Sequence, residues 1–285
     1  MRGTRAADGR RATVVAALLL GVACGSPPTP TAPGAPPDPA AFLESGGARL
    51  HYALDLPAGA GPHPGVVIGH GSGRVTKTDG AAYVAPLLQR GFAVLRYDKR
   101  GVGQSTGTYR GVSAENSMAQ IAELGGDLAA AASFLASRPG IDGRRIGLMG
   151  TSQAGWVMVA AASGSDDVRF VVAVTGSVLP VGENIFYEGL RGLPIEEAYA
   201  RLPLFDGFPG YDPLPSLTDL SAPTLWLFGE QDRLVPTREC VRILEGLRAA
   251  GRPVDFVVYP GGEHSLPGVS FWADVGVFLD RRALR

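Results

Sequence analysis

Three side chains in this chain of 285 residues are of the types that perform acyl transfer together: a serine, a histidine and an aspartate. The serine, Ser152, lies in the segment RIGLMGTSQAG, where an apolar run is followed by a turn and then by a helical pattern. A serine hydroxyl is a weak nucleophile unless a base takes its proton, and a sharp strand-to-helix turn between small residues keeps the hydroxyl exposed. Gly150 precedes Ser152, and Ala154 and Gly155 follow it. We expect Ser152 to be a nucleophile.

The base and the acid that such a serine needs follow later in the chain. His264 lies in YPGGEHSL, directly after an apolar run, which is a suitable position for an exposed general base. Asp232 lies in GEQDRLVP, also after an apolar run, and can orient the histidine and stabilise its protonated form. Glu230 is the nearby alternative for the acid. The residues are 80 and 32 positions apart, in the order serine, aspartate, histidine.

Acyl transfer also requires two backbone N–H donors that face the developing oxyanion. The segment HGSG, from His70 to Gly73, follows an apolar run, and its glycines permit close approach of the backbone to a substrate. We expect the N–H groups of Ser72 and of Gln153, the residue after the nucleophile, to form this oxyanion hole. We interpret His70 as a structural, hydrogen-bonding residue rather than a second base.

Short apolar runs alternate with helical patterns from about residue 41, which predicts an α/β protein with a mostly parallel sheet. Strands are expected near residues 41–45, 49–54, 66–70, 93–97, 145–149, 170–174, 224–228 and 254–259. Helices are expected near residues 117–137, 153–163, 237–250 and 269–282. Residues 177–222 are longer than a simple crossover and rich in aromatic side chains. We expect this segment to be a cap-like insertion that shapes a ligand pocket.

The ordered segments HGSG, YDKRGVGQSTG, GTSQAG, GEQDRLVP and GGEHS resemble those of bacterial α/β-hydrolases of the serine-esterase, dienelactone-hydrolase-like or S33-aminopeptidase-like type. The resemblance covers nearly everything after about residue 42. It implies the α/β-hydrolase fold, with helices on both faces of a mostly parallel central sheet, and it implies a triad in the chain order seen here. Asp98 and Arg100 belong to a tight turn near the active site in this family. We interpret them as structural residues that bond each other or the backbone, with substrate contact as the alternative.

The resulting hypothesis is a serine hydrolase that cleaves small carboxylic esters through an acyl-enzyme on Ser152, without a cofactor or metal ion. The alternatives are a peptidase or amidase, an acyltransferase with the same triad, or a catalytically silent binding lipoprotein. A net charge of −1 and a pI near 6.4 argue against a nucleic-acid partner. The chain has no glycine-rich nucleotide motif and no cluster of residues at metal-ligand spacing. We expect no protein partner.

The first 24 residues have the pattern of a bacterial lipoprotein signal peptide. Arginines precede an apolar stretch of 12 residues, 12–23, which is too short to span a bilayer as a helix. The segment LGVAC resembles a lipobox with glycine at a position where leucine is usual, and this resemblance implies lipidation of Cys24. The alternatives are a secretory signal cut near Ala23, which gives a secreted or periplasmic protein, and a short N-terminal anchor. Residues 25–40 are proline-rich and predict a linker to a catalytic domain over residues 41–285.

Overall fold

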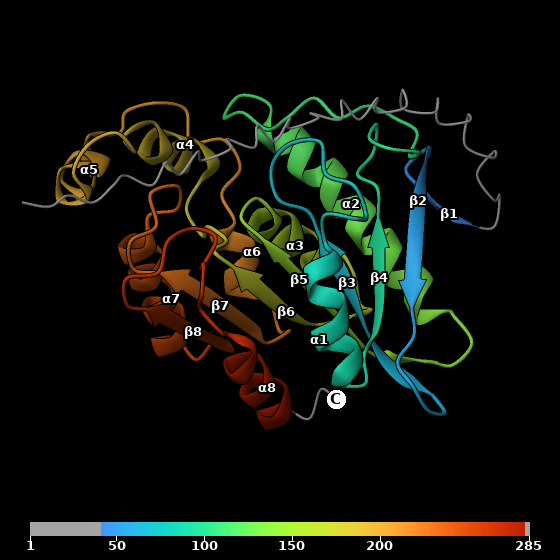
Figure 1. Cartoon of the computed structure of the whole chain (residues 1–285). Helices are drawn as coiled ribbons and strands as arrows, with labels where there is room; N and C mark the ends of the chain where they lie inside the picture. The colour runs from blue at the N-terminus through green and yellow to red at the C-terminus, as the bar shows by residue number, and fades with distance from the viewer. Residues whose placement is uncertain (1–40, 283–285) are drawn as a thin grey trace, which may run out of the picture. The chain divides into compact units, whose positions relative to one another are not determined.

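The apolar runs form one eight-stranded sheet in the computed structural model, which describes residues 41–282 (Figure 1). The strands are β1 (Phe42–Ser45), β2 (Ala48–Asp55), β3 (His63–Gly69), β4 (Ala93–Tyr97), β5 (Ile141–Thr151), β6 (Val168–Val174), β7 (Thr224–Gly229) and β8 (Val254–Tyr259). Their order across the sheet is β1-β2-β4-β3-β5-β6-β7-β8. Strand β2 runs antiparallel to β1 and β4, whereas β4, β3, β5, β6, β7 and β8 run parallel to one another.

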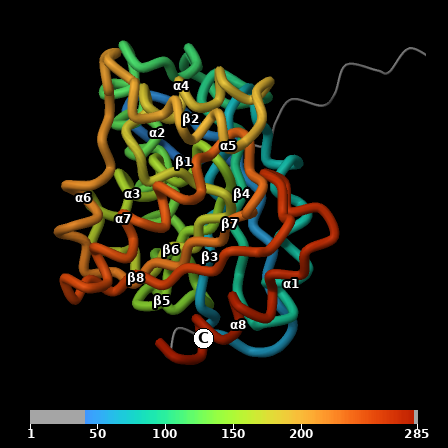
Figure 2. Tube along the Cα trace, turned by 90° about the vertical axis from the view of Figure 1, so that its left-hand side faces the viewer, coloured from blue at the N-terminus to red at the C-terminus, as the bar shows by residue number. Residues whose placement is uncertain are grey.

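Helices cover both faces of this sheet. The helices are α1 (Val84–Gln89), α2 (Ser117–Ala136), α3 (Ala154–Ser163), α4 (Val181–Gly189), α5 (Ile195–Arg201), α6 (Leu214–Asp219), α7 (Thr237–Ala249) and α8 (Trp272–Arg281), with short 3-10 turns at Ala81–Tyr83 and Leu202–Leu204. Figure 2 shows α1 and α8 on one side of the strands and α3, α6 and α7 on the other. This arrangement, together with the sheet order, confirms the predicted α/β-hydrolase fold.

The alternation of side chains along the strands divides the core into two layers. Leu148 and Val171 pack in the layer that contains α2, α3 and α7. Their neighbours Met149 and Val172 pack in the layer that contains α1 and α8. Successive side chains of a strand point to opposite faces, so a strand covered by helices on both sides is apolar at nearly every position. This is why the central strands appear in the sequence as continuous apolar runs.

One helix was missed, and several boundaries differ from the prediction by a few residues. Helix α1 was not predicted, because it is only six residues long and contains a proline. Strand β5 begins at Ile141 instead of 145, since Ile141 pairs with His63 ahead of an irregularity in the register. Helix α8 begins at Trp272 instead of 269, because Val269 donates its N–H to the carbonyl of Leu266 in a turn that precedes the helix.

The segment 177–222 folds into α4, α5 and α6, and Figure 1 shows α4 and α5 beyond the end of the sheet at which the parallel strands finish. Loops at this edge of an α/β sheet commonly hold the ligand site. The predicted signal peptide, Cys24 and the linker lie outside the described residues. Among the helices of residues 41–282, none combines the length and apolar character that crossing a bilayer requires.

Candidate active site

The backbone of Ser152 adopts a left-handed conformation at the tip of the turn between β5 and α3. Its φ angle is 58°, which is uncommon for a residue with a side chain and marks a position that the surrounding structure holds in place. The N–H of Ser152 donates to the carbonyl of Val174 at the end of β6 (3.0 Å), and Gly155 N–H donates to the carbonyl of Ser152 (2.9 Å). These two bonds fix the turn from both sides and hold Ser152 at the carboxyl edge of the sheet.

The nucleophile turn of α/β-hydrolases usually has the pattern G-x-S-x-G, and this chain has Ala154 in place of the second glycine. The surrounding geometry shows how alanine is accommodated. A Cβ atom added to Gly150 would lie 2.6 Å from the Cβ of Ala154 and 2.7 Å from the carbonyl oxygen of Gly69. The absence of a side chain at Gly150 therefore leaves room for the methyl group of Ala154. The glycine that follows has its own role, because a Cβ at Gly155 would lie 3.0 Å from the Cα of Gly176 and would push α3 away from β6.

Asp232 and His264, 32 residues apart in the sequence, are brought into direct contact by the loops after β7 and β8. Asp232 Oδ2 lies 2.8 Å from His264 Nδ1, and Asp232 Oδ1 accepts the backbone N–H groups of Leu234 (2.8 Å) and Val235 (2.9 Å). The carboxylate is fully buried, whereas the His264 side chain is 21% exposed. Asp232 is thus fixed by the backbone, and the ring of His264 keeps its Nε2 atom for another partner.

The competing acid, Glu230, has a different role. Its carboxylate accepts the N–H of Gly261 at 3.0 Å, and the residue is exposed. It therefore braces the loop before His264 and does not pair with the imidazole. Among the hydrogen bonds of the described residues, none joins the hydroxyl of Ser152 to His264. In serine nucleophile sites this bond often tightens only when substrate binds.

Ser152, Ser72 and Gln153 line one pocket of about 180 Å³ at the carboxyl edge of the sheet. Within residues 41–282, no acceptor takes the N–H of Ser72 or that of Gln153, so both donors are available to a ligand. Gln153 is also the residue at the N-terminus of α3, where backbone N–H groups and the helix dipole favour negative charge. The two predicted oxyanion donors therefore lie beside the predicted nucleophile.

The rest of the pocket is mostly apolar. Its other lining residues are Val112, Trp156, Ser177, Val181, Asn184, Ile185, Glu188, Leu234 and Val235. Five of them belong to the segment 177–222, and Trp156 is held in place by a hydrogen bond from its indole Nε1 to the carbonyl of Leu179 (2.9 Å). The segment expected to shape a pocket thus contributes a large part of its wall.

Helix α4 also anchors the loop that contains the acid. Tyr187 donates its hydroxyl to the carbonyl of Asp232 (3.0 Å), and the side-chain amide of Asn184 donates to the carbonyl of Leu234 (3.1 Å). Both residues are buried. The wall of the pocket and the position of the acid are therefore mechanically linked through α4.

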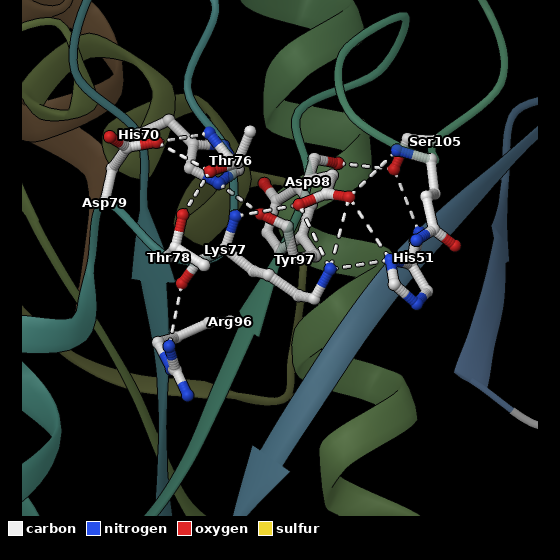
Figure 3. Close-up of polar contacts among 11 residues, drawn as sticks. His51, His70, Thr76, Lys77, Thr78, Asp79, Arg96, Tyr97, Asp98 and Ser105 are labelled. Atoms are coloured by element: carbon white, nitrogen blue, oxygen red, sulfur yellow. Dashed lines mark hydrogen bonds and ion pairs between the residues drawn. The ribbon is translucent and has the colours of Figure 1, made fainter. Parts of the chain in front are cut away.

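The turn that contains Asp98 is structural, and Asp98 bonds the backbone, which is one of the two arrangements expected. Asp98 does not pair with Arg100; its carboxylate accepts the N–H groups of Lys77 (2.9 Å) and Gln104 (3.0 Å) and lies beside His51. Figure 3 shows this cluster around Asp98. His51 is consequently half-buried.

Arg100 reaches α2 instead, where its guanidinium binds the carboxylates of Asp127 and Glu123. His70 is structural as expected, with its Nε2 atom 2.7 Å from the carbonyl of Tyr97. Burial, and then the charge of Lys99, lower the pKa of His70 from 6.5 to about 4, so its ring is neutral near pH 7. His70 is therefore a poor candidate for a second base, because its Nε2 atom is engaged by the carbonyl of Tyr97 and its lowered pKa makes the ring a weak base.

One residue of the site was missed by sequence reasoning. Lys99 is fully buried, and its ammonium contacts the carbonyl groups of Gly71 and Gly73 beside Ser72. The available signal was its position directly after a buried strand, in a chain that has only two lysines, Lys77 and Lys99.

The buried thiol of Cys240 is not a second nucleophile, because burial raises its pKa to about 12. Within residues 41–282, no group of three potential metal ligands occurs.

Comparison with known proteins shows what this chain is similar to. The sequence model of the prolyl oligopeptidase family (peptidase family S9) matches residues 80–274, more than half of the chain. A probable dipeptidyl-aminopeptidase B of Fusarium vanettenii is 31% identical over 207 residues, which are 70% of this chain and 21% of that protein. A putative carboxymethylenebutenolidase of Methylorubrum extorquens is 27% identical over 213 residues, which are 74% of this chain and 65% of that protein. The chain spans less than two thirds of either relative.

A comparison of structures supports the same fold. The structure of Est1E from Butyrivibrio proteoclasticus with bound ferulic acid superposes with a TM-score of 0.64 at 19% sequence identity. The match covers 86% of this chain and 99% of that one. The arrangement of strands and helices is therefore shared over nearly the whole of the smaller protein.

Proposed function

Because this chain belongs to the prolyl oligopeptidase family within the α/β-hydrolase superfamily, we propose that it cleaves carboxylic esters through an acyl-enzyme on Ser152. The observation that carries the proposal is one pocket in which Ser152, with its left-handed backbone, adjoins the N–H groups of Ser72 and Gln153, which no acceptor among residues 41–282 takes. His264 supplies the base, and it is paired with the buried Asp232 on the neighbouring loop. These groups match the parts that acyl transfer requires.

Acylation begins when the Ser152 hydroxyl attacks the ester carbonyl carbon and His264 Nε2 takes the hydroxyl proton. The carbonyl oxygen becomes an oxyanion, which accepts hydrogen bonds from the N–H groups of Ser72 and Gln153. Asp232, 2.8 Å from Nδ1, stabilises the imidazolium. The tetrahedral intermediate then expels the alcohol, to which His264 returns the proton, and the acyl group remains on the serine oxygen.

Deacylation repeats these steps with water in place of the serine hydroxyl. His264 takes a proton from water, and the hydroxide oxygen adds to the acyl carbon while the same two N–H groups bind the oxyanion. The bond to the oxygen of Ser152 then breaks, and His264 returns the proton to it. The products are the carboxylic acid and the free enzyme, and no cofactor takes part.

The pocket supports a small acyl group. Its volume of about 180 Å³ is below the roughly 300–1,000 Å³ that drug-sized ligands occupy. Apolar side chains such as Trp156, Val181 and Ile185 favour an uncharged acyl chain. The name of the Methylorubrum extorquens relative points to a small lactone, which is a cyclic ester.

A peptidase is the second candidate, and the family match together with the dipeptidyl-aminopeptidase relative favours it. Rates of hydrolysis of p-nitrophenyl esters and of matched p-nitroanilides, with acyl groups from acetyl to octanoyl, distinguish an esterase from a peptidase. An amine is a poorer leaving group than an alcohol, so its departure depends more strongly on protonation by His264. We expect ester turnover with short acyl chains and its loss in Ser152→Ala. Equal turnover of anilides would favour the peptidase. Transfer of the acyl group to an added alcohol would favour an acyltransferase, and inertness toward both substrate sets would favour a binding protein.

We also propose that the protein is exported and anchored to the membrane through lipid on Cys24, on the basis of the lipobox-like segment and the proline-rich stretch that follows it. One acyl chain anchors a protein only weakly, whereas several hold it firmly. Expression in a bacterium fed radiolabelled palmitate tests this proposal. We expect label in the parent protein and none in Cys24→Ala, and an unlabelled parent recovered from the cytoplasm would refute it.

A further inference from the structure

Lys99 lies beneath the oxyanion loop, two residues after the end of β4, and only 1% of its surface is exposed. Its ammonium nitrogen lies 2.7 Å from the carbonyl oxygen of Gly71, 3.0 Å from that of Gly73 and 3.3 Å from the side-chain oxygen of Gln153. An ammonium group has three N–H donors. All three are therefore matched by acceptors on the two segments that provide the oxyanion donors.

Because the peptide group is planar, a contact that fixes the carbonyl of Gly71 also fixes the direction of the Ser72 N–H. In a trans peptide the carbonyl of one residue and the N–H of the next point in opposite directions. The carbonyl of Gly71 is directed to Lys99, so the N–H of Ser72 is directed away from it. The second donor, Gln153 N–H, belongs to a residue whose side chain is bound to the same ammonium.

We propose that Lys99 is a positioning residue that fixes both N–H donors of the oxyanion hole, Ser72 through the carbonyl of Gly71 and Gln153 through its side chain. This inference rests on the proposed function of the site. Lys99 does not contact the reacting atoms in this arrangement. It holds the donors in place before the reaction. No free energy is therefore needed to orient them when the transition state forms.

Among residues 41–282, no carboxylate forms an ion pair with Lys99, and burial alone shifts its pKa. Among the described residues that face it are the neutral ring of His70 and the rings of Tyr97 and Tyr109, the latter 4.3 Å from its nitrogen. The carboxylate of Asp98 is turned to Lys77 and Gln104. On α2, which packs nearby, Asp127 and Glu123 are bound by Arg100.

Burial lowers the pKa of Lys99 from 10.5 to about 7. The neutral amine has two N–H donors, so at least one of its three acceptors loses its partner when the proton leaves. We therefore expect kcat/KM to fall as pH rises above about 7, since this ratio reports ionisations of the free enzyme. The free energy of unfolding changes in the opposite direction. Because the pKa of Lys99 is lower in the folded chain than in the unfolded chain, the unfolded chain binds more protons between pH 7 and 10.5, and the contribution of Lys99 to stability increases over this range.

Lys77 provides a matched control, because it is the only other lysine in the chain. Its ammonium lies with His51 and Asp98 in the cluster of Figure 3, and among the described hydrogen bonds it makes none to Gly71, Gly73 or Gln153. Lys77→Met removes the same functional group and the same charge as Lys99→Met. A difference between the two variants therefore reports the location of the lysine.

The experiment measures kcat and KM of the full chain on a short p-nitrophenyl ester from pH 6 to 9. For Lys99→Met we expect kcat to fall on the order of 10²-fold with KM nearly unchanged, as for loss of an oxyanion donor. We also expect the decline in kcat/KM above pH 7 to disappear. Lys77→Met should keep the parent's kcat and its alkaline decline. Parental kcat in Lys99→Met, or a loss that appears in KM alone, would overturn the proposal.

Two further measurements keep the outcome decisive. The rate at which a fluorophosphonate reacts with Ser152 depends on the same N–H donors, so it tests Lys99 even if the natural substrate is not an ester. A parent that reacts with the probe but cleaves no ester would refute the ester proposal and leave this test intact. If Lys99→Met does not fold, as judged by circular dichroism, Lys99→Ala takes its place. A parental kcat and a parental labelling rate in that variant would overturn the role of Lys99.

Discussion

His264 Nδ1 lies 2.8 Å from Asp232 Oδ2, and the other oxygen of this carboxylate accepts two backbone N–H groups. The carboxylate has no freedom to rotate without breaking those bonds, so it fixes the orientation of the imidazole. It also places the proton of the neutral ring on Nδ1 and leaves Nε2 as the base.

Asp232→Asn should lower kcat by about 10⁴-fold with little change in fold. The amide oxygen can still accept the N–H groups of Leu234 and Val235, which turns the amide NH₂ group toward His264 and forces Nδ1 to become the acceptor. Nε2 then carries the proton and cannot take one from Ser152. Glu230→Gln is the control and should keep the parent's kcat. Similar losses in both variants would contradict the assignment of the acid.

Gly229→Ala should lower activity by displacing the loop that contains His264. A Cβ atom at Gly229 would collide with the carbonyl of Gly262 and lie 2.6 Å from that of Glu263. We expect a fall of kcat by at least about 10-fold, because small displacements of catalytic groups are costly. Gly246→Ala on α7, where a Cβ meets nothing within 4 Å, is the matched control. Unchanged kcat in Gly229→Ala would show that the loop adapts without moving His264.

His70 should make the protein less stable in mild acid. Its folded pKa of about 4 is below the ordinary value of 6.5, so between these values the unfolded chain binds more protons. The free energy of unfolding should fall as pH drops from 6.5 to 4, by up to about 3 kcal/mol from this residue. Urea unfolding of His70→Phe across this range should show a shallower pH dependence. An equal slope in parent and variant would contradict the prediction.

Ile185 should set the length of the acyl group that the pocket accepts. It lies on α4 at the pocket wall and is partly exposed, so its truncation enlarges the site without opening the core. Ile185→Ala should shift the highest kcat/KM toward longer acyl chains, and Ile185→Trp should restrict turnover to acetyl esters. The measurement is a series of p-nitrophenyl esters from two to eight carbons. An unchanged preference in both variants would show that the acyl group binds elsewhere.

Much of this fold could be predicted because its central strands are buried on both sides and its chemistry-bearing residues follow those strands directly. Ser152 and Asp232 follow the buried strands β5 and β7, whereas His264 follows the partly buried edge strand β8. The order of their motifs indicated how the sheet would bring them to one edge. The contact between Asp232 and His264 could be anticipated from that order alone.

The details that sequence reasoning missed depend on packing between distant segments. Arg100 was expected to bond Asp98 or the backbone but binds Asp127, because α2 presents that carboxylate to the turn. The ammonium of Lys99 contacts the carbonyl of Gly71, which lies on a loop 28 residues earlier in the sequence. Neither partner is near in sequence, and no local propensity reports such a contact.

The most direct test of the proposed mechanism is to treat the protein with a fluorophosphonate and locate the adduct by intact-mass and peptide mass spectrometry. The mechanism predicts one adduct per chain, on Ser152, with none in Ser152→Ala and a much slower reaction in His264→Ala. An adduct on another residue, or labelling of Ser152→Ala at the parent's rate, would contradict the assignment of the nucleophile.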